Sequence, residues 1–103
     1  MRAIEDPQEV AQWVATREAI LSELRTLLVE SLGVRRPPET IDPDTPIFGS
    51  GLGLDSVDAV ELVVGLERRF GVRPPDDLET RACMRTPNTL TDLVLRLREE
   101  KAQ

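Results

Sequence analysis

Residues 51–62 read GLGLDSVDAVEL, a glycine-rich turn that runs into a helix. The glycines allow a sharp bend and leave little side-chain bulk around Ser56. Asp55 and Ser56 are both good N-cap types, so the helix is expected to start at one of them. An apolar stripe is expected to follow at helical spacing, made of Val57, Val60, Val64 and Leu66. The hydroxyl of Ser56 would then be anchored at its backbone and open on its outer side.

Three interpretations of Ser56 follow from these residues. The simplest makes it only a helix cap, because a serine there accepts hydrogen bonds from free amides of the first turn. The second makes it a place to attach a group. The third, a catalytic serine, is disfavoured because the chain has no histidine to act as base, and its only lysine is Lys101 near the end. We therefore expect no catalytic residue, and nothing in the sequence indicates a metal site.

Residues 48–70 carry a longer pattern, FxxxLGxDSVDxVELVxxLExxF, without gaps. This pattern resembles the prosthetic-group segment of acyl carrier proteins. The resemblance implies that Ser56, next to Asp55 of the same motif, carries 4′-phosphopantetheine through a phosphodiester added by a separate phosphopantetheinyl transferase. The thiol at the far end of that arm would hold an acyl group as a thioester.

Length and composition bound the rest of the protein. At 103 residues it is expected to be one domain with a modest core. Apolar residues make up 40% but aromatic ones only 3%, which favours aliphatic side chains packed between helices. The net charge of −6 repels phosphates, so nucleic acid is not an expected partner. No apolar run approaches the roughly 20 residues that span a bilayer, and a single cysteine fits a reducing cytoplasm.

The chain is expected to fold as an all-α, four-helix bundle of the acyl-carrier type, with a long loop after the first helix and a short third helix. Apolar residues at three- and four-residue steps predict a first helix over 7–32, with one continuous stripe interrupted only at Arg17. Four prolines exclude a regular helix between residues 33 and 50. The later helices are predicted over 56–70, over 76–81 and from a capping box at 89–92.

We interpret residues 16–103 as the acyl carrier domain, because residues 16–32 also match the first helix of the family. Residues 1–15 would be an N-terminal extension that lengthens the first helix, with residues 1–6 frayed. Trp13 in this extension either covers the end of the domain or anchors a docking surface. In the second helix, Gly65 either permits close helix approach or leaves room for an acyl chain, and Cys83 is interpreted as a packed small hydrophobe.

The resemblance further implies that partner enzymes dock on the second helix, whose acidic face attracts their basic patches. Acidic groups in a first turn also stabilise a helix by themselves, so these residues have a structural explanation as well. Arg68 and Arg69 depart from the family's acidic pattern at this helix end, which indicates a specialised set of partners. The residues expected to contact partners are Val57, Asp58, Glu61, Val64, Arg68 and Arg69. Those expected to shelter the acyl chain are Phe48, Leu66 and Leu90.

The leading interpretation is a non-catalytic, monomeric carrier of acyl groups for fatty-acid or polyketide-type synthesis. Its partners would be the transferase and acyl-loading and acyl-transferring enzymes such as a ligase or a ketosynthase. A standalone aminoacyl or D-alanyl carrier stays open, although GLDS at residues 53–56 differs from the Gly-Gly-x-Ser usual in peptidyl carriers. The alternative from another class is an unmodified four-helix adaptor in which Ser56 only caps its helix.

Overall fold

The computed structural model describes residues 6–102, and in this range it is an all-α bundle, as the sequence predicts. A single isolated bridge, between Phe48 and Leu54, is the only extended pairing among the described residues. Within the same range, no helix combines the length and the apolar character that crossing a membrane requires. The helical elements are α1 (Pro7–Glu30), the 3-10 turn η1 (Pro38–Thr40), α2 (Ser56–Phe70), α3 (Leu78–Cys83) and α4 (Pro87–Ala102).

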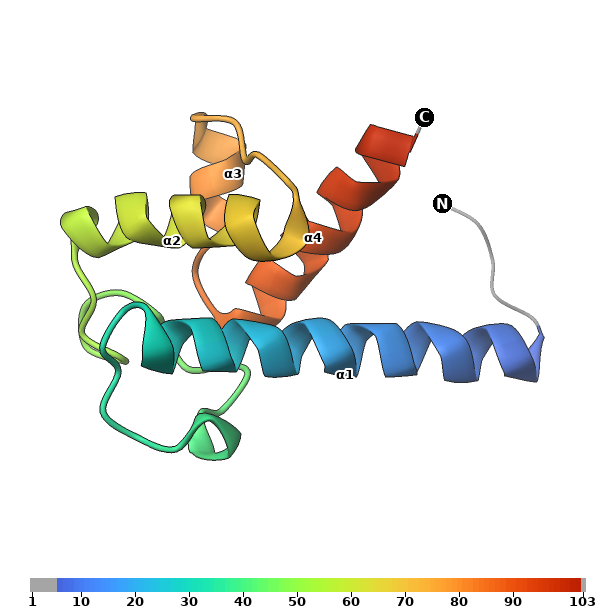
Figure 1. The fold of residues 1–103 in the computed structure, drawn as a ribbon, viewed down its shortest axis with the longest axis horizontal. Helices are drawn as coiled ribbons and strands as arrows, with labels where there is room; N and C mark the ends of the chain where they lie inside the picture. The colour runs from blue at the N-terminus through green and yellow to red at the C-terminus, as the bar shows by residue number, and fades with distance from the viewer. Residues whose placement is uncertain (1–5, 103) are drawn as a thin grey trace.

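Helix α1 is the longest element and sets the long axis of the molecule (Figure 1). Its 24 residues correspond to about 36 Å at the usual helical rise, against a longest dimension of 40 Å. Asp6 begins the helix, because its side chain accepts a hydrogen bond from the Gln8 amide at 2.9 Å. The expected fraying of residues 1–6 is therefore wrong for Asp6, and residues 1–5 lie outside the described range.

The first half of α1 extends past α2, and its apolar residues remain exposed (Figure 1). Val10, Trp13 and Val14 are 42%, 48% and 45% exposed, and burial starts only at Ile20. The apolar stripe that the sequence predicts from Val10 is therefore buried only from Ile20 onward. Periodicity identifies the side of a helix that is apolar, but it does not show where along the helix a neighbour packs against it.

The core is aliphatic and is built mainly between the second half of α1 and helices α2 and α4. Helices α1 and α2 approach closely at Gly65, where an added Cβ would lie 2.6 Å from Cδ1 of Leu27. This answers the question about Gly65 in favour of close helix approach. The side chains that are completely buried include Leu24, Leu28, Leu62, Leu66, Leu90 and Val94.

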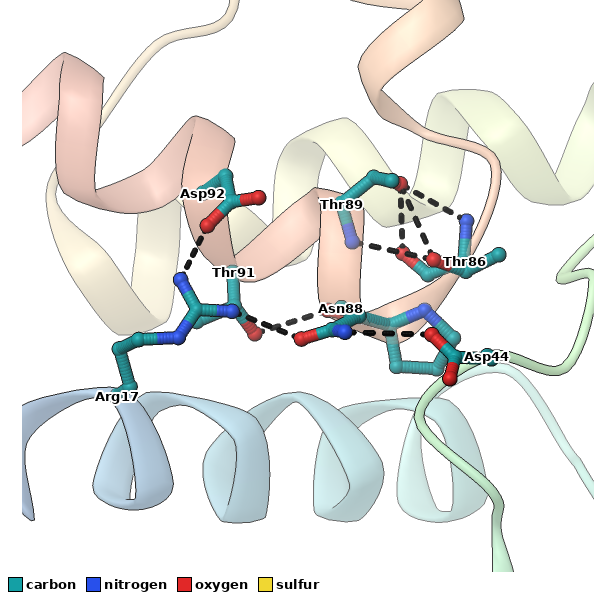
Figure 2. Close-up of polar contacts among 8 residues, drawn as sticks. Arg17, Asp44, Thr86, Asn88, Thr89, Thr91 and Asp92 are labelled. Atoms are coloured by element: carbon teal, nitrogen blue, oxygen red, sulfur yellow. Dashed lines mark hydrogen bonds and ion pairs between the residues drawn. The ribbon is translucent and has the colours of Figure 1, made fainter. Parts of the chain in front are cut away.

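A polar cluster joins α1, the long loop and the start of α4 (Figure 2). The guanidinium of Arg17 forms an ion pair with Asp92 and donates to the side-chain oxygen of Asn88 at 2.8 Å. The side-chain amide of Asn88 in turn donates to Asp44 of the loop at 3.2 Å. The guanidinium carbon of Arg17 lies over the ring of Trp13, 5.3 Å from the centroid of the ring. Arg17, the one polar break in the predicted stripe, therefore fastens α1 to α4.

The loop between α1 and α2 is held to the core by two buried isoleucines. Ile41 and Ile47 are 1% and 0% exposed. The backbone oxygen of Ile41 accepts a hydrogen bond from Arg25 Nε at 2.8 Å, and the amide of Ile47 donates to the oxygen of Arg85 at 2.8 Å. This loop delivers the chain to the start of α2 from a fixed direction.

The starts of the last two helices differ from the sequence predictions. Helix α3 begins at Leu78 instead of residue 76, because the Asp77 side chain caps it by accepting from the Thr80 amide at 2.7 Å. Helix α4 begins at Pro87, and its capping pair is Thr86 with Thr89 instead of the predicted box at residues 89–92 (Figure 2). Proline suits a first helical position, which moves the start three residues earlier.

Candidate functional site

Asp55 is the residue that caps α2. Its Oδ1 accepts hydrogen bonds from the amides of Val57 at 2.9 Å and Asp58 at 3.1 Å. The Oδ2 of Asp58 accepts from the amide of Asp55 at 2.9 Å, which completes a reciprocal capping box. The amide of Asp58, the largest cause, lowers the pKa of the Asp55 carboxyl, so this carboxyl is ionised at neutral pH.

Ser56 is the first residue of α2 and is exposed. The structure gives its hydroxyl no hydrogen-bond partner among the described residues, because Asp55 supplies the cap. The interpretation of Ser56 as only a helix cap is therefore wrong. The side chain is fixed at a helix start by its backbone and carries an unengaged primary hydroxyl at the surface.

Ser56 lines a pocket of about 310 Å³. It lies between the start of α2, the loop before it and the end of α3. Of the three residues expected to shelter an acyl chain, Phe48 lines this pocket, whereas Leu66 and Leu90 are completely buried in the core. The lining consists of Phe48, Leu54, Asp55, Ser56, Ala59, Arg81 and Met84.

Arg81 and Met84 are the pocket residues that sequence reasoning did not identify. They come from α3 and its C-terminal cap, more than twenty positions after Ser56. Their place at the pocket depends on how α3 packs against the rest of the bundle. No local sequence signal reports that packing.

The outer face of α2 is apolar at its surface. Val57, Val60 and Val64 are 67%, 65% and 42% exposed. Val57 and Val64, which the resemblance implies as partner contacts, are thus exposed. Leu66 does not share their face, since the buried face of α2 consists of Leu62, Gly65, Leu66 and Phe70. A shallow hollow of about 230 Å³ lies between α1 and α2. It is lined by Leu27, Ser31, Val60, Glu61, Val64, Gly65, Arg68 and Arg69.

The charged residues of α2 fall into two groups. Asp58 belongs to the cap, and Arg69 turns toward α1, where it pairs with Glu30 at 3.1 Å and Glu23 at 3.7 Å. Glu61 and Arg68 are exposed and have no ion pair within residues 6–102. Of the two arginines that depart from the acidic pattern, Arg68 is thus the one whose charge faces solvent.

The two helix-capping aspartates predict a loss of stability in acid. Backbone amides, chiefly those of Asp58 and Thr80, hold the pKa of Asp55 and of Asp77 below the ordinary 3.8. Their stabilisation is full above the unfolded pKa and is lost as the pH falls through the folded value. We expect the thermal unfolding midpoint to fall below about pH 4. Circular dichroism melts at several acid pH values would compare wild type, Asp55→Asn and Glu100→Gln, a change at an exposed residue. The thermal midpoint should depend less steeply on pH, below about pH 4, in Asp55→Asn alone. An acid slope for Asp55→Asn equal to that of the wild type would contradict this assignment.

Comparison with known proteins agrees with this geometry. The family model described as "Phosphopantetheine attachment site" matches residues 22–81. Two curated relatives, the anthracycline acyl carrier proteins DauA of Streptomyces sp. (strain C5) and DpsG of Streptomyces peucetius, are each 41% identical over 73 residues, which cover 71% of this chain and 83% of theirs. The acyl carrier protein of Guillardia theta is 38% identical over 60 residues, 58% of this chain and 70% of its own. The chain therefore belongs to the acyl carrier protein family, whose members carry a covalently attached 4′-phosphopantetheine.

Proposed function

We propose that Ser56 is the residue to which the phosphopantetheine arm is attached. The observation that carries this proposal is that Asp55, and not Ser56, caps α2. Asp55 provides the cap of α2 and leaves the Ser56 hydroxyl exposed and without a partner. A primary hydroxyl in this state fits a phosphodiester, since the transferase can reach it and no cap is broken when it is modified.

The surrounding residues hold the attachment point still. The reciprocal bonds between Asp55 and Asp58 fix the first turn of α2, and the bridge between Phe48 and Leu54 fixes the loop before it. The arm supplies a thiol that holds the acyl group as a thioester. Tethering then gives each partner enzyme a high effective concentration of substrate, and we propose that the chain itself catalyses no step.

We further propose that the cargo is of the polyketide type. Two relatives named anthracycline acyl carrier proteins align over 73 residues, more than the 60 residues of the acyl carrier protein from Guillardia theta. Fatty-acid synthesis is the nearest alternative. A standalone aminoacyl or D-alanyl carrier is the next alternative, although GLDS at residues 53–56 differs from the Gly-Gly-x-Ser usual in peptidyl carriers.

The proposed partners are a phosphopantetheinyl transferase and acyl-loading and acyl-transferring enzymes such as a ligase or a ketosynthase. We propose that they contact the exposed valines of α2 and the charges of Glu61 and Arg68, because these side chains face solvent. The carrier domain in this proposal is residues 16–103, with residues 1–15 as an extension. The protein would act as a monomer in the cytoplasm.

The test of Ser56 is the intact mass of the protein before and after incubation with coenzyme A and a broad-specificity phosphopantetheinyl transferase. We expect wild type to gain one phosphopantetheine group, because its hydroxyl is accessible. Ser56→Ala should gain none, whereas Ser50→Ala, a matched change at an exposed serine of the preceding loop, should gain one. The assignment would be refuted if Ser56→Ala were modified. It would also be refuted if wild type stayed unmodified while a control carrier in the same reaction gained the group.

A further inference from the structure

The pocket beside Ser56 is mostly apolar, and Arg81 contributes the one basic side chain of its lining. Phe48, Leu54, Ala59 and Met84 form the apolar part, and the acidic member is Asp55. Ser56 and Arg81 thus lie on opposite elements, α2 and α3, and share one small cavity of about 310 Å³. A group joined to the Ser56 oxygen therefore starts beside a cavity that this arginine also lines.

A phosphate on Ser56 would enter an acidic neighbourhood. The carboxylates of Asp55 and Asp58 flank the residue and are held in place by the capping box. A helix N-terminus ordinarily offers free amides to an anion, but here Asp55 already occupies the amides of Val57 and Asp58. The amide of Ala59 donates to the backbone oxygen of Asp55 at 3.0 Å, so few amides of the first turn are free to bind an anion. The counter-ion for a phosphate has to come from another element.

Arg81 is available for this role. Its present partner is Asp76, whose Oδ1 accepts from Nη2 at 2.7 Å, and the two side chains are 66% and 84% exposed. An ion pair this exposed contributes little to stability and is readily exchanged. A guanidinium has five N–H donors in a planar fork that matches phosphate oxygens, so Arg81 can take a second anion.

We propose that Arg81 binds the phosphodiester of the phosphopantetheine arm. The inference rests on the proposed attachment at Ser56 and adds a binding residue on a different helix. Its N–H groups donate to the unesterified phosphate oxygens, in place of or together with the carboxylate of Asp76. The arm is thereby directed toward the flank of α2 that faces α3.

This direction separates the arm from the surface proposed for partners. The pocket uses Ser56 and Ala59 on one flank of α2, whereas Val60, Glu61 and Val64 line the hollow on the flank facing α1. The buried residues Leu62 and Leu66 lie between these flanks. An arm held by Arg81 leaves the valine surface uncovered for an enzyme to contact.

The experiment compares modified and unmodified protein for wild type, Arg81→Gln and Arg81→Lys. Arg96→Gln is the matched control, because Arg96 pairs with Glu79 of α3 at 3.0 Å but does not line the pocket. Modification is verified by mass, and the phosphodiester is followed by its phosphorus NMR resonance at low and at raised salt. Unfolding equilibria in urea are measured for both forms of each variant.

We expect Arg81→Gln to shift the phosphorus resonance and to remove its salt dependence, with Arg81→Lys intermediate and Arg96→Gln like wild type. The unfolding equilibrium constant of the modified form, relative to the unmodified one, should rise about two- to fivefold in Arg81→Gln only. An unchanged resonance, or equal destabilisation of both forms, would overturn the role of Arg81 and leave Ser56 untouched. Absence of modification at Ser56 would instead refute the attachment and this inference together.

Discussion

Leu66→Ala is expected to lower the free energy of unfolding by about 2–5 kcal/mol. Leu66 is 0% exposed and belongs to the buried face of α2, next to Gly65, where α1 and α2 approach closely. Truncation removes apolar contacts and leaves a cavity that this tight contact between helices cannot close. Urea unfolding followed by far-ultraviolet circular dichroism would give the change, and the thermal midpoint should fall by at least about 8 °C.

Val60→Ala on the same helix is the matched control for this prediction. Val60 is 65% exposed, so its truncation should change the free energy of unfolding by no more than about 0.5 kcal/mol. The pair separates burial from helix propensity, because both changes introduce alanine into the interior of α2. Equal effects of the two substitutions would show that α2 packs with a different face from the one described.

Gly51→Ala is expected to disturb the loop that leads to the attachment point. A Cβ at this position would lie 1.9 Å from the backbone oxygen of Pro46 and 2.7 Å from its carbonyl carbon. The amide of Leu52 donates to the same oxygen at 2.8 Å, so the clash falls on a backbone contact that no rotamer change relieves. Overpacking of this kind costs about 1–3 kcal/mol and shifts the chain that precedes α2.

The measurements are urea unfolding and the rate at which the transferase modifies Ser56. Both stability and rate should fall in Gly51→Ala, because Asp55 and Ser56 follow the disturbed turn directly. Ser50→Ala, one residue earlier and exposed, should leave both unchanged. Wild-type stability together with a wild-type rate in Gly51→Ala would show that the loop can move away from Pro46 freely.

Helix α2 was predictable to its end residues because its signals are local. Asp55 and Ser56 are cap types, no proline or glycine interrupts the next eight residues, and Gly71 follows Phe70. Each of these residues determines the backbone conformation within one or two helical turns of its own position, so no distant contact is needed to predict the ends of α2. The identity of the attachment motif was readable for the same reason, as an ungapped run over 48–70.

The orientation of α2 was not predictable from its apolar residues alone, although the resemblance implied that Val57 and Val64 contact partners. Its valines and its leucines both recur at helical spacing, and apolar character alone does not decide which set is covered. The structure buries Leu62 and Leu66 and exposes Val57 and Val60, because α1 packs against the leucine side of α2. Arg81 was not predicted as a pocket residue for a related reason, since its position at the pocket depends on how α3 packs.

The polar cluster at Arg17 has a consequence for how this chain acquires its structure during synthesis. The ion pair of Arg17 with Asp92 joins positions 75 residues apart, and α1 packs extensively against α4. Contacts between such distant segments form only after a large loop has closed. A nascent chain that has reached α3 still lacks Leu90 and Val94, which α4 contributes to the core. The core is therefore completed only when α4 emerges from the ribosome and docks on α1, which was made much earlier.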